Sequence, residues 1–178
     1  MYKEVMNFWF SEIEPKQWWQ KDEEFDLLIE RRFGALHGQA KAGELFAWRT
    51  SPLGSLAEVI VLDQFSRNIY RDKPASFACD PLALALAQTA IAKGFDLELS
   101  EAERSFLYLP FMHSESKVIH QEAVKLYETF AVKDSLEFEL RHKAIIDRFG
   151  RYPHRNAILG RPSTSDEIAF LKQPGSSF

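Results

Sequence analysis

Residues 62–71 of this chain read LDQFSRNIYR, and they lie where a long apolar helical pattern ends. Residues 146–156, near the other end of the chain, read IDRFGRYPHRN and repeat part of that pattern. Each stretch has an aliphatic residue before an Asp, a Phe two places after the Asp, and an Arg two places after the Phe. Both stretches therefore bring charged side chains to the ends of expected helices, and any functional site should lie there.

Helical patterns extend outward from these two stretches. Apolar residues recur every three to four positions from Phe25 to Leu36, from Leu56 into residues 62–71, and from Leu136 to Phe149. Several residues have the sequence context of a helix N-cap, among them Asp22, Ser51, Asp80, Ser100 and Thr164. No segment combines a clean period of two with β-branched enrichment. We therefore expect an all-α fold with seven to nine helices.

Two local patterns predict how these helices pack. Residues 82–92 are apolar nearly all round, which is typical of a helix in the middle of a domain. Gly34 and Gly38 lie within an expected helix, where a missing side chain allows a second helix to approach closely. The expected central helix is therefore the one that starts at Asp80.

Length and composition predict one domain. The chain has 178 residues, of which 46% are hydrophobic, so it has enough apolar material for one core. We expect a single all-α domain over residues 1–172 and a frayed C-terminal tail over residues 173–178.

Cysteine usage and hydropathy predict the compartment. Cys79 is the only cysteine, which excludes an intramolecular disulfide and a cysteine-based zinc site. The first residues lack the pattern of a secretory signal. The longest apolar stretch, residues 82–92, is far shorter than the roughly 20 residues that span a bilayer. We expect a soluble, cytoplasmic protein that does not enter membranes.

The charge distribution bears on partners. The net charge of -4 argues against general nucleic-acid binding, which requires a basic surface. The region from Arg141 to Arg161 nevertheless holds six Lys or Arg residues and one Asp, so it favours an anionic small molecule or protein segment. An alternative is that these arginines pair with carboxylates of the chain itself.

The arginines supply the candidate binding residues, because a guanidinium group matches a carboxylate or phosphate with two parallel hydrogen bonds. The ligand-binding candidates are Arg67, Asn68, Arg148, Arg151, Arg155 and Asn156. A structural role is the alternative, since Asp63 with Arg67 and Asp147 with Arg151 have the i,i+4 spacing of ion pairs within a helix.

The candidate catalytic residues are His113, Glu115, Asp63 and His154. Pro110 precedes His113 and predicts a bend that exposes the imidazole beside a carboxylate, as acid–base chemistry near neutral pH requires. The alternative is that residues 114–116 only cap the next helix. No His-Glu-x-x-His spacing and no phosphate-binding glycine loop occurs, so we expect neither a metal nor a cofactor.

The ordered set of motifs resembles the bacterial domain-of-unknown-function family 924. The residues that carry the resemblance are residues 8–10 (FWF), 18–19 (WW), 62–68 (LDQFSRN), 80–81 (DP), 109–115 (LPFMHSE), 148–156 (RFGRYPHRN) and 159–161 (LGR), with Thr164 and Glu167. The family pattern more often has Pro where this chain has Ser66. The resemblance implies an all-α array of antiparallel helical hairpins similar to tetratricopeptide-like folds, and it implies no activity.

Three functions stay open at this point. The first is a binding module with an arginine-rich cleft for an anionic small molecule or peptide. The second is an enzyme that acts on a carboxylate or phosphate substrate through a histidine and a carboxylate. The third is a structural protein whose arginine and aspartate motifs are internal salt bridges.

Overall fold

Helix α3 (Pro52–Ile69) is the central element of the computed structural model, which describes residues 1–130 and 133–177. Thirteen consecutive residues of this helix, Gly54 to Ser66, are buried. They include the polar Ser55, Glu58 and Asp63, so α3 is surrounded on all sides. The first charged stretch of the sequence therefore lies inside the protein rather than on its surface.

Helices account for all the regular structure within residues 1–130 and 133–177. The other α-helices are α1 (Tyr2–Asn7), α2 (Glu23–Lys41), α4 (Asp80–Ala92), α5 (Glu101–Met112), α6 (Lys117–Phe130), α7 (Lys133–Phe149) and α8 (Ser165–Phe170). Short 3-10 turns join several of them, and one π-helical turn, Phe8–Glu12, extends α1. The all-α prediction is confirmed; the tetratricopeptide-like arrangement stays a prediction.

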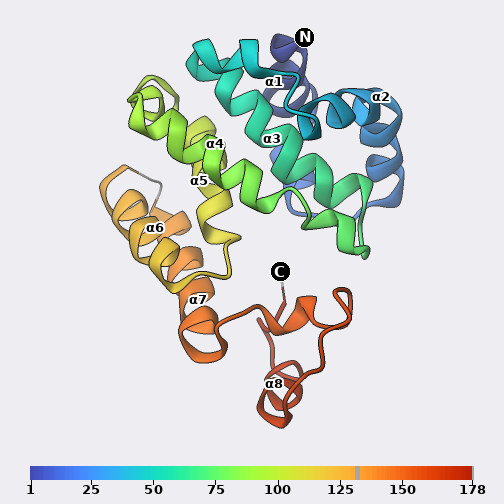
Figure 1. The fold of residues 1–178 in the computed structure, drawn as a ribbon, viewed down its shortest axis with the longest axis vertical. Helices are drawn as coiled ribbons and strands as arrows, with labels where there is room; N and C mark the ends of the chain where they lie inside the picture. The colour runs from blue at the N-terminus through green and yellow to red at the C-terminus, as the bar shows by residue number, and fades with distance from the viewer. Residues whose placement is uncertain (131–132, 178) are drawn as a thin grey trace.

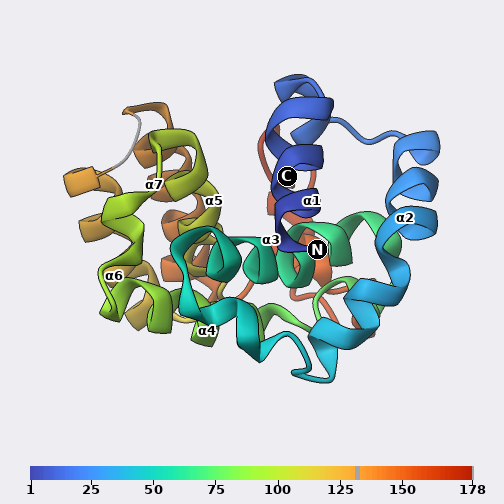
Figure 2. The same ribbon diagram turned by 90° about the horizontal axis from the view of Figure 1, so that it is seen from above.

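The helices pack mainly on their neighbours in the sequence. Helices α1, α2 and α4 contact α3, and α6 contacts both α5 and α7. Figure 2 shows α2 at one end of the molecule and α6 with α7 at the other, with α3 between them. The segment after α7 carries the second charged stretch and α8, and it lies at one end of the longest axis (Figure 1).

Of the expected N-caps Asp22, Ser51, Asp80, Ser100 and Thr164, all but Asp80 are present. Asp22, Ser51, Ser100 and Thr164 each accept hydrogen bonds from backbone N–H groups in the first turn of their helix. Asp80 is different, because α4 begins at Asp80 itself and Cys79 occupies the N-cap position without a side-chain cap. The Asp80 carboxylate instead contacts Arg67 and Arg155. The prediction that Asp80 caps α4 was therefore wrong.

The expected position of α4 was also wrong. Its buried residues are Ala83, Ala87 and Ala90, whereas its leucines are only partly buried. The alanines recur every three to four positions and therefore share one face of the helix. Because α3 already occupies the centre, α4 packs on the core through this small-residue face and exposes part of its larger side chains.

The close approach expected at Gly34 and Gly38 occurs elsewhere. A Cβ atom at Gly38 would meet nothing within 4 Å, and one at Gly34 would meet only the side chain of Glu30, 3.9 Å away. At Gly54, in the first turn of α3, a Cβ atom would lie 2.2 Å from the carbonyl oxygen of Trp48. Gly54 is thus the glycine that allows tight packing.

Among the residues that the structure describes, one segment has the length and hydropathy of a membrane span, Pro74–Ala92, with a mean hydropathy of 1.3 over its window. In the structure this segment is interrupted: a 3-10 turn at Pro74–Ser76 precedes α4, which has 13 residues. At 1.5 Å per residue α4 is about 20 Å long, shorter than the roughly 30 Å hydrocarbon core of a bilayer. The structure is compatible with a soluble protein.

Candidate functional site

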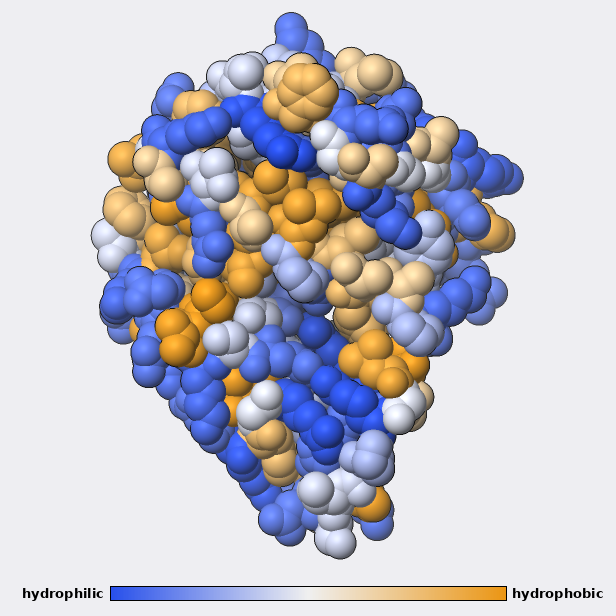
Figure 3. All heavy atoms as spheres, viewed as in Figure 1, coloured by the Kyte–Doolittle hydropathy of each residue, from blue (hydrophilic) through white to orange (hydrophobic). Residues whose placement is uncertain are grey.

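The two charged stretches meet at Asp80. Arg67 of the first stretch donates from Nη1 and Nη2 to the two Asp80 oxygens, each at 3.1 Å. Arg155 of the second stretch donates from Nη1 to Asp80 Oδ2 at 3.3 Å. Figure 3 shows hydrophilic residues lining a recess between the helical body and the segment that follows α7. The structure thus brings together two of the arginines that the sequence singled out.

Asp63 and His113 form a pair beside these arginines. Asp63 Oδ1 lies 2.7 Å from His113 Nδ1 and 3.0 Å from Arg67 Nη1. Gln64 donates from Nε2 to the other carboxylate oxygen. Burial alone would raise the pKa of the Asp63 carboxyl, but the charge of Arg67 and the hydrogen bond from His113 outweigh it and hold that pKa well below its usual range. Asp63 is therefore an ionised acceptor at neutral pH.

The ionised Asp63 determines the tautomer of His113. Burial, followed by the charge of Arg67, lowers the pKa of the His113 imidazole, so the ring is neutral at pH 7. Because the Asp63 carboxylate only accepts, Nδ1 carries the proton and Nε2 holds a free lone pair. Nε2 has no partner among the described residues, yet it is not among the buried unpaired atoms, so it reaches solvent. An imidazole held in this way can accept a proton at Nε2.

One edge of the Arg155 guanidinium group, formed by Nε and Nη2, has no hydrogen-bond partner among the described residues, and we call it the open edge. Its side chain is 6% exposed and lies between the rings of Phe77 and Tyr152, each centred 4.6 Å from its Cζ. Only Nη1 is hydrogen-bonded; Nε is buried without a partner, and Nη2 has none within the described part of the chain. Burial lowers the pKa of Arg155.

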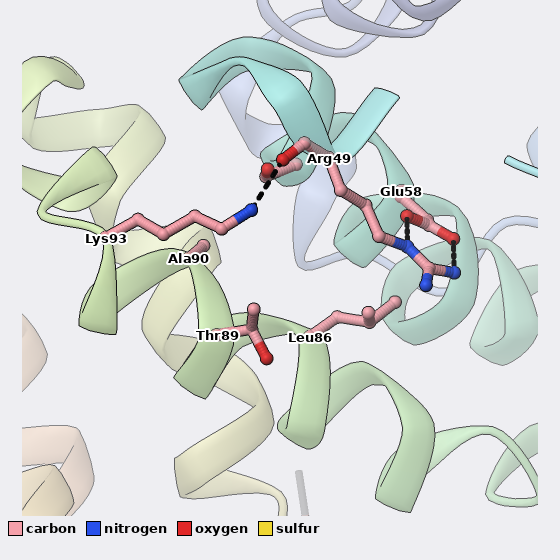
Figure 4. Close-up of a pocket in the computed structure, with 7 residues that line it drawn as sticks. Arg49, Glu58, Leu86, Thr89, Ala90 and Lys93 are labelled. Atoms are coloured by element: carbon pink, nitrogen blue, oxygen red, sulfur yellow. Dashed lines mark hydrogen bonds and ion pairs between the residues drawn. The ribbon is translucent and has the colours of Figure 1, made fainter. Parts of the chain in front are cut away.

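In two other arginines of this protein, a carboxylate accepts hydrogen bonds from the edge formed by Nε and Nη2. Arg49 donates from Nε and Nη2 to the two oxygens of the buried Glu58, each at 2.7 Å, beside a cavity of about 10 Å³ (Figure 4). Arg151 presents the same pair of nitrogens to Glu167, at 2.7 and 2.8 Å. The open edge of Arg155 thus lacks the carboxylate that the same edge contacts in Arg49 and Arg151.

We had expected Glu115 to act together with His113, but the carboxylate that contacts His113 is that of Asp63. Glu115 accepts from Nη1 and Nη2 of Arg161, at 2.6 and 2.9 Å, and from the backbone N–H of Tyr152 at 2.7 Å. Burial opposes ionisation, but these donors together lower the pKa of Glu115. Helix α5 runs through Pro110 to Met112 before the chain turns. Glu115 is therefore an anchor for the segment after α7.

Two candidate amides are already engaged. Asn68 donates from Nδ2 to Asp26 Oδ1 at 2.8 Å, beside Arg71, which donates to both oxygens of the same carboxylate. Asn156 is fully buried, donates to Ser163 Oγ at 3.1 Å and accepts from Arg161 Nε at 3.0 Å. Both candidates therefore have structural partners.

The proposed pair of Asp147 with Arg151 does not form. Helix α7 ends at Phe149, and Gly150 follows with a φ of +70°, so the chain leaves the helix before Arg151. Asp147 pairs with Lys143 instead, at 2.5 Å, and its side chain is 47% exposed. The matching Asp63–Arg67 pair does form. The two stretches are thus alike in sequence and different in environment.

The remaining candidates, Arg148 and His154, have different surroundings. Arg148 is on the surface, stacked over Phe149 at 4.6 Å and Phe170 at 5.8 Å, and it lines a groove beside the C-terminal residues. His154 interacts with the charges of Arg155 and Glu115, and its ring is tilted against that of Tyr152, with 5.6 Å between ring centres. Burial, followed by the charge of Arg155, lowers the pKa of His154 to about 4.

Sequence reasoning missed several residues of this region. Asp80 was assigned to a helix cap, although its carboxylate joins the two stretches. Tyr152 is buried and holds the carbonyl of Met112, and nothing in its sequence context distinguishes it from a core aromatic. Within the described residues no three His, Cys, Asp or Glu side chains are placed to hold a metal ion.

This geometry defines a class of protein. Its members are all-α, with a cluster of charged side chains between the central helix and the C-terminal segment. Residues 5–175 match the family described as bacterial protein of unknown function (DUF924), and the chain belongs to that family. The chain is also similar to the solved structure of a protein of unknown function, ATU0120, from Agrobacterium tumefaciens. The two are 38% identical over 96% of each chain, with a TM-score of 0.91. No curated protein matches the chain.

Proposed function

We propose that this protein binds a small molecule or peptide segment through a carboxylate placed on the open edge of Arg155. The observation that carries the proposal is the unpartnered Nε of a guanidinium group that is almost completely buried. A buried donor without an acceptor is unfavourable, by roughly 1–3 kcal/mol, and an incoming carboxylate relieves that cost. The walls of the site are Phe77 and Tyr152, and Asp80 holds the opposite edge of the group.

The side-chain N–H resonances of the arginines test this proposal directly. Protein labelled with ¹⁵N is titrated with acetate, succinate and inorganic phosphate, and the Nε–H signals are followed by NMR. We expect a saturable shift of the Arg155 signal with a carboxylate probe. Arg49 and Arg151 are internal controls, because Glu58 and Glu167 already fill their edges. An Arg155 signal that stays unchanged with all three probes contradicts the proposal.

A second candidate function is acid–base catalysis on the bound anion. The observation that favours it is the 2.7 Å contact of Asp63 with His113, which leaves Nε2 free at the solvent-accessible side of the ring. A buried carboxylate that orients an imidazole in this way is a recurring catalytic arrangement. His113 would accept or return a proton, and Arg155 would hold the substrate.

Hydrolysis of two anionic chromogenic probes, mono-4-nitrophenyl succinate and 4-nitrophenyl phosphate, tests this second function. We expect turnover that is lost in both His113→Gln and Arg155→Met and retained in Arg151→Met. Turnover of both probes no faster than in buffer, or turnover indifferent to both substitutions, contradicts it. The binding proposal is judged separately by the NMR titration.

The structural alternative accounts for several other arginines. Arg71, Arg151 and Arg161 each place two nitrogens on a carboxylate of the chain itself, so their hydrogen-bonding edges are filled. We therefore confine the proposed site to Arg155 and its neighbours. The cytoplasmic location remains part of the proposal, supported by the single, buried Cys79. The net charge of -4 supports a partner other than nucleic acid.

A further inference from the structure

A second histidine–carboxylate pair lies deeper in the protein, between α6 and α7. His120 on α6 and Glu139 on α7 are both fully buried, and His120 Nδ1 lies 2.7 Å from Glu139 Oε1. Neither residue belongs to the site described above. The pair nevertheless connects to that site, because the other nitrogen of the imidazole reaches the backbone beside His113.

The hydrogen bonds of His120 show that its Nε2 carries a proton. This nitrogen lies 2.8 Å from the carbonyl oxygen of Ser114, which only accepts, so Nε2 must carry a proton. The hydroxyl of Tyr152 is 3.2 Å from the same nitrogen and donates its own proton to the carbonyl of Met112. Two states of the pair remain: a protonated Glu139 with a neutral His120, or a carboxylate with an imidazolium.

The second oxygen of Glu139 distinguishes these two states. Glu139 Oε2 is buried and has no hydrogen-bond partner in the described part of the chain. In a carboxylate this oxygen would carry half of a negative charge without solvation, which is costly. In a carboxylic acid that donates from Oε1, it is a carbonyl oxygen, and its lack of a partner costs less.

The surroundings of Glu139 favour the neutral state. Burial raises the pKa of Glu139, and His120 and Lys143 oppose that rise only in part. The ammonium group of Lys143 is itself paired with Asp147. Two phenols also interact with Glu139, that of Tyr127 on α6 and that of Tyr152. Both are neutral, because burial raises the pKa of Tyr127 well above 10 and also raises that of Tyr152.

We infer that Glu139 is protonated and donates a hydrogen bond to Nδ1 of a neutral His120, and that this pair positions His113. His120 donates to the carbonyl of Ser114, and Tyr152 donates to the carbonyl of Met112, so the backbone is held on both sides of His113. Glu139 is the residue that keeps His120 in the required tautomer. The positioning role rests on the proposed function of His113, whereas the protonation state does not.

The ¹⁵N NMR spectrum of the histidine rings at pH 7 tests the protonation state. We expect His120 to show one protonated nitrogen, Nε2, and one lone-pair nitrogen, Nδ1. Glu139→Gln should leave this pattern unchanged, because a side-chain amide also donates to Nδ1. Glu137→Gln, an exposed change on the same helix, is the matched control. An imidazolium pattern in the parent that becomes neutral in Glu139→Gln overturns the inference.

The positioning role is tested on the His113 ring. In His120→Leu we expect the Nδ1 proton signal of His113 to shift and broaden, because the carbonyl of Ser114 loses its donor. Tyr152→Phe removes a single hydroxyl and serves the same purpose if the leucine variant does not fold. Glu139→Gln should leave the His113 signal in place. An unchanged His113 signal in a folded His120→Leu or Tyr152→Phe variant contradicts the positioning role. A failed carboxylate titration would instead refute the binding proposal and leave the His120 spectrum as described.

Discussion

Asp63 Oδ1 lies 2.7 Å from His113 Nδ1, and this contact joins the middle of α3 to the C-terminal end of α5. The two residues are far apart in the sequence. Each belongs to a motif that fits an ordinary helix end as well as it fits a functional site. Their contact places an ionised carboxylate, a neutral imidazole and the guanidinium group of Arg67 in one buried cluster. The proposed proton transfer by His113 depends on this cluster.

The first prediction compares the two aspartates of the repeated pattern. Asp63→Asn removes a buried charge next to Arg67 and His113, so we expect a loss of about 3–5 kcal/mol in the free energy of unfolding, measured in urea. Asp147→Asn is the control, because Asp147 is exposed and its carboxylate pairs with Lys143 across one turn of the helix. It should change the midpoint little. Equal losses in the two variants would contradict this account.

A second prediction concerns Arg155 and Arg151. Arg155 is buried with an incomplete set of partners, so Arg155→Met should change the free energy of unfolding by less than about 1 kcal/mol or increase it. Arg151→Met should lower the urea midpoint, because it leaves the buried Glu167 without its guanidinium partner. A large loss in Arg155→Met would show that Arg155 is a structural tie, and the binding site would lose its main support.

The third prediction uses two helical glycines. Gly54→Ala places a Cβ atom 2.2 Å from the carbonyl oxygen of Trp48, and backbone does not move as readily as a side chain. We expect a loss of about 1–3 kcal/mol in the free energy of unfolding. Gly38→Ala meets nothing within 4 Å and should stabilise the protein by about 0.4–1 kcal/mol. Thermal unfolding of both variants checks the pair, and a stabilising Gly54→Ala would refute the packing argument.

Glu167 provides a prediction on acid stability. The side-chain hydrogen bond from Arg151 lowers its pKa from 4.5 to about 2. The unfolded state therefore binds the proton first, so the stabilisation is present above pH 4.5 and is lost as the pH falls towards 2. Glu167→Gln should show a shallower loss of stability than the parent between pH 5 and 3, measured by urea unfolding at each pH. Parallel pH profiles would contradict it.

Two buried histidines provide the last prediction. Burial lowers the pKa of His37 to about 4 and that of His142 to about 3. Their unfolded forms take up a proton near pH 6.5, so the stabilisation from the neutral rings is present above that value and is lost as the pH falls through 4. An NMR titration should find both rings neutral at pH 5.5. A midpoint near 6.5 for either ring would contradict the burial argument.

Local features of the sequence predicted the helices well. The caps at Asp22, Ser51, Ser100 and Thr164 lie where their side chains and the residues after them indicated. The cap prediction failed at Asp80 because an aspartate before a proline suits a cap and an ion pair equally well. Only the position of Arg67 and Arg155 in the fold decides between the two roles. Cap prediction is therefore sound only where no distant partner competes.

The core was harder to predict. The apolar composition of α4 suggested a central helix, yet the central helix is α3, which buries Glu58 and Asp63 as well as its apolar residues. A buried carboxylate cannot be predicted from periodicity, because its burial requires a donor from elsewhere. For Glu58 that donor is Arg49, and for Asp63 it is Arg67 together with His113.

The sequence by itself determined the all-α class, the positions of most helices and the family, because helical periodicity and capping act over a few residues. Only the tertiary structure decided which of two similar motifs is buried and which arginine keeps an open edge. Asp63 and Asp147 have nearly the same neighbours in sequence, but one lies inside the protein and the other on its surface. Burial and charge pairing are properties of segments that meet in space, and no local pattern contains them.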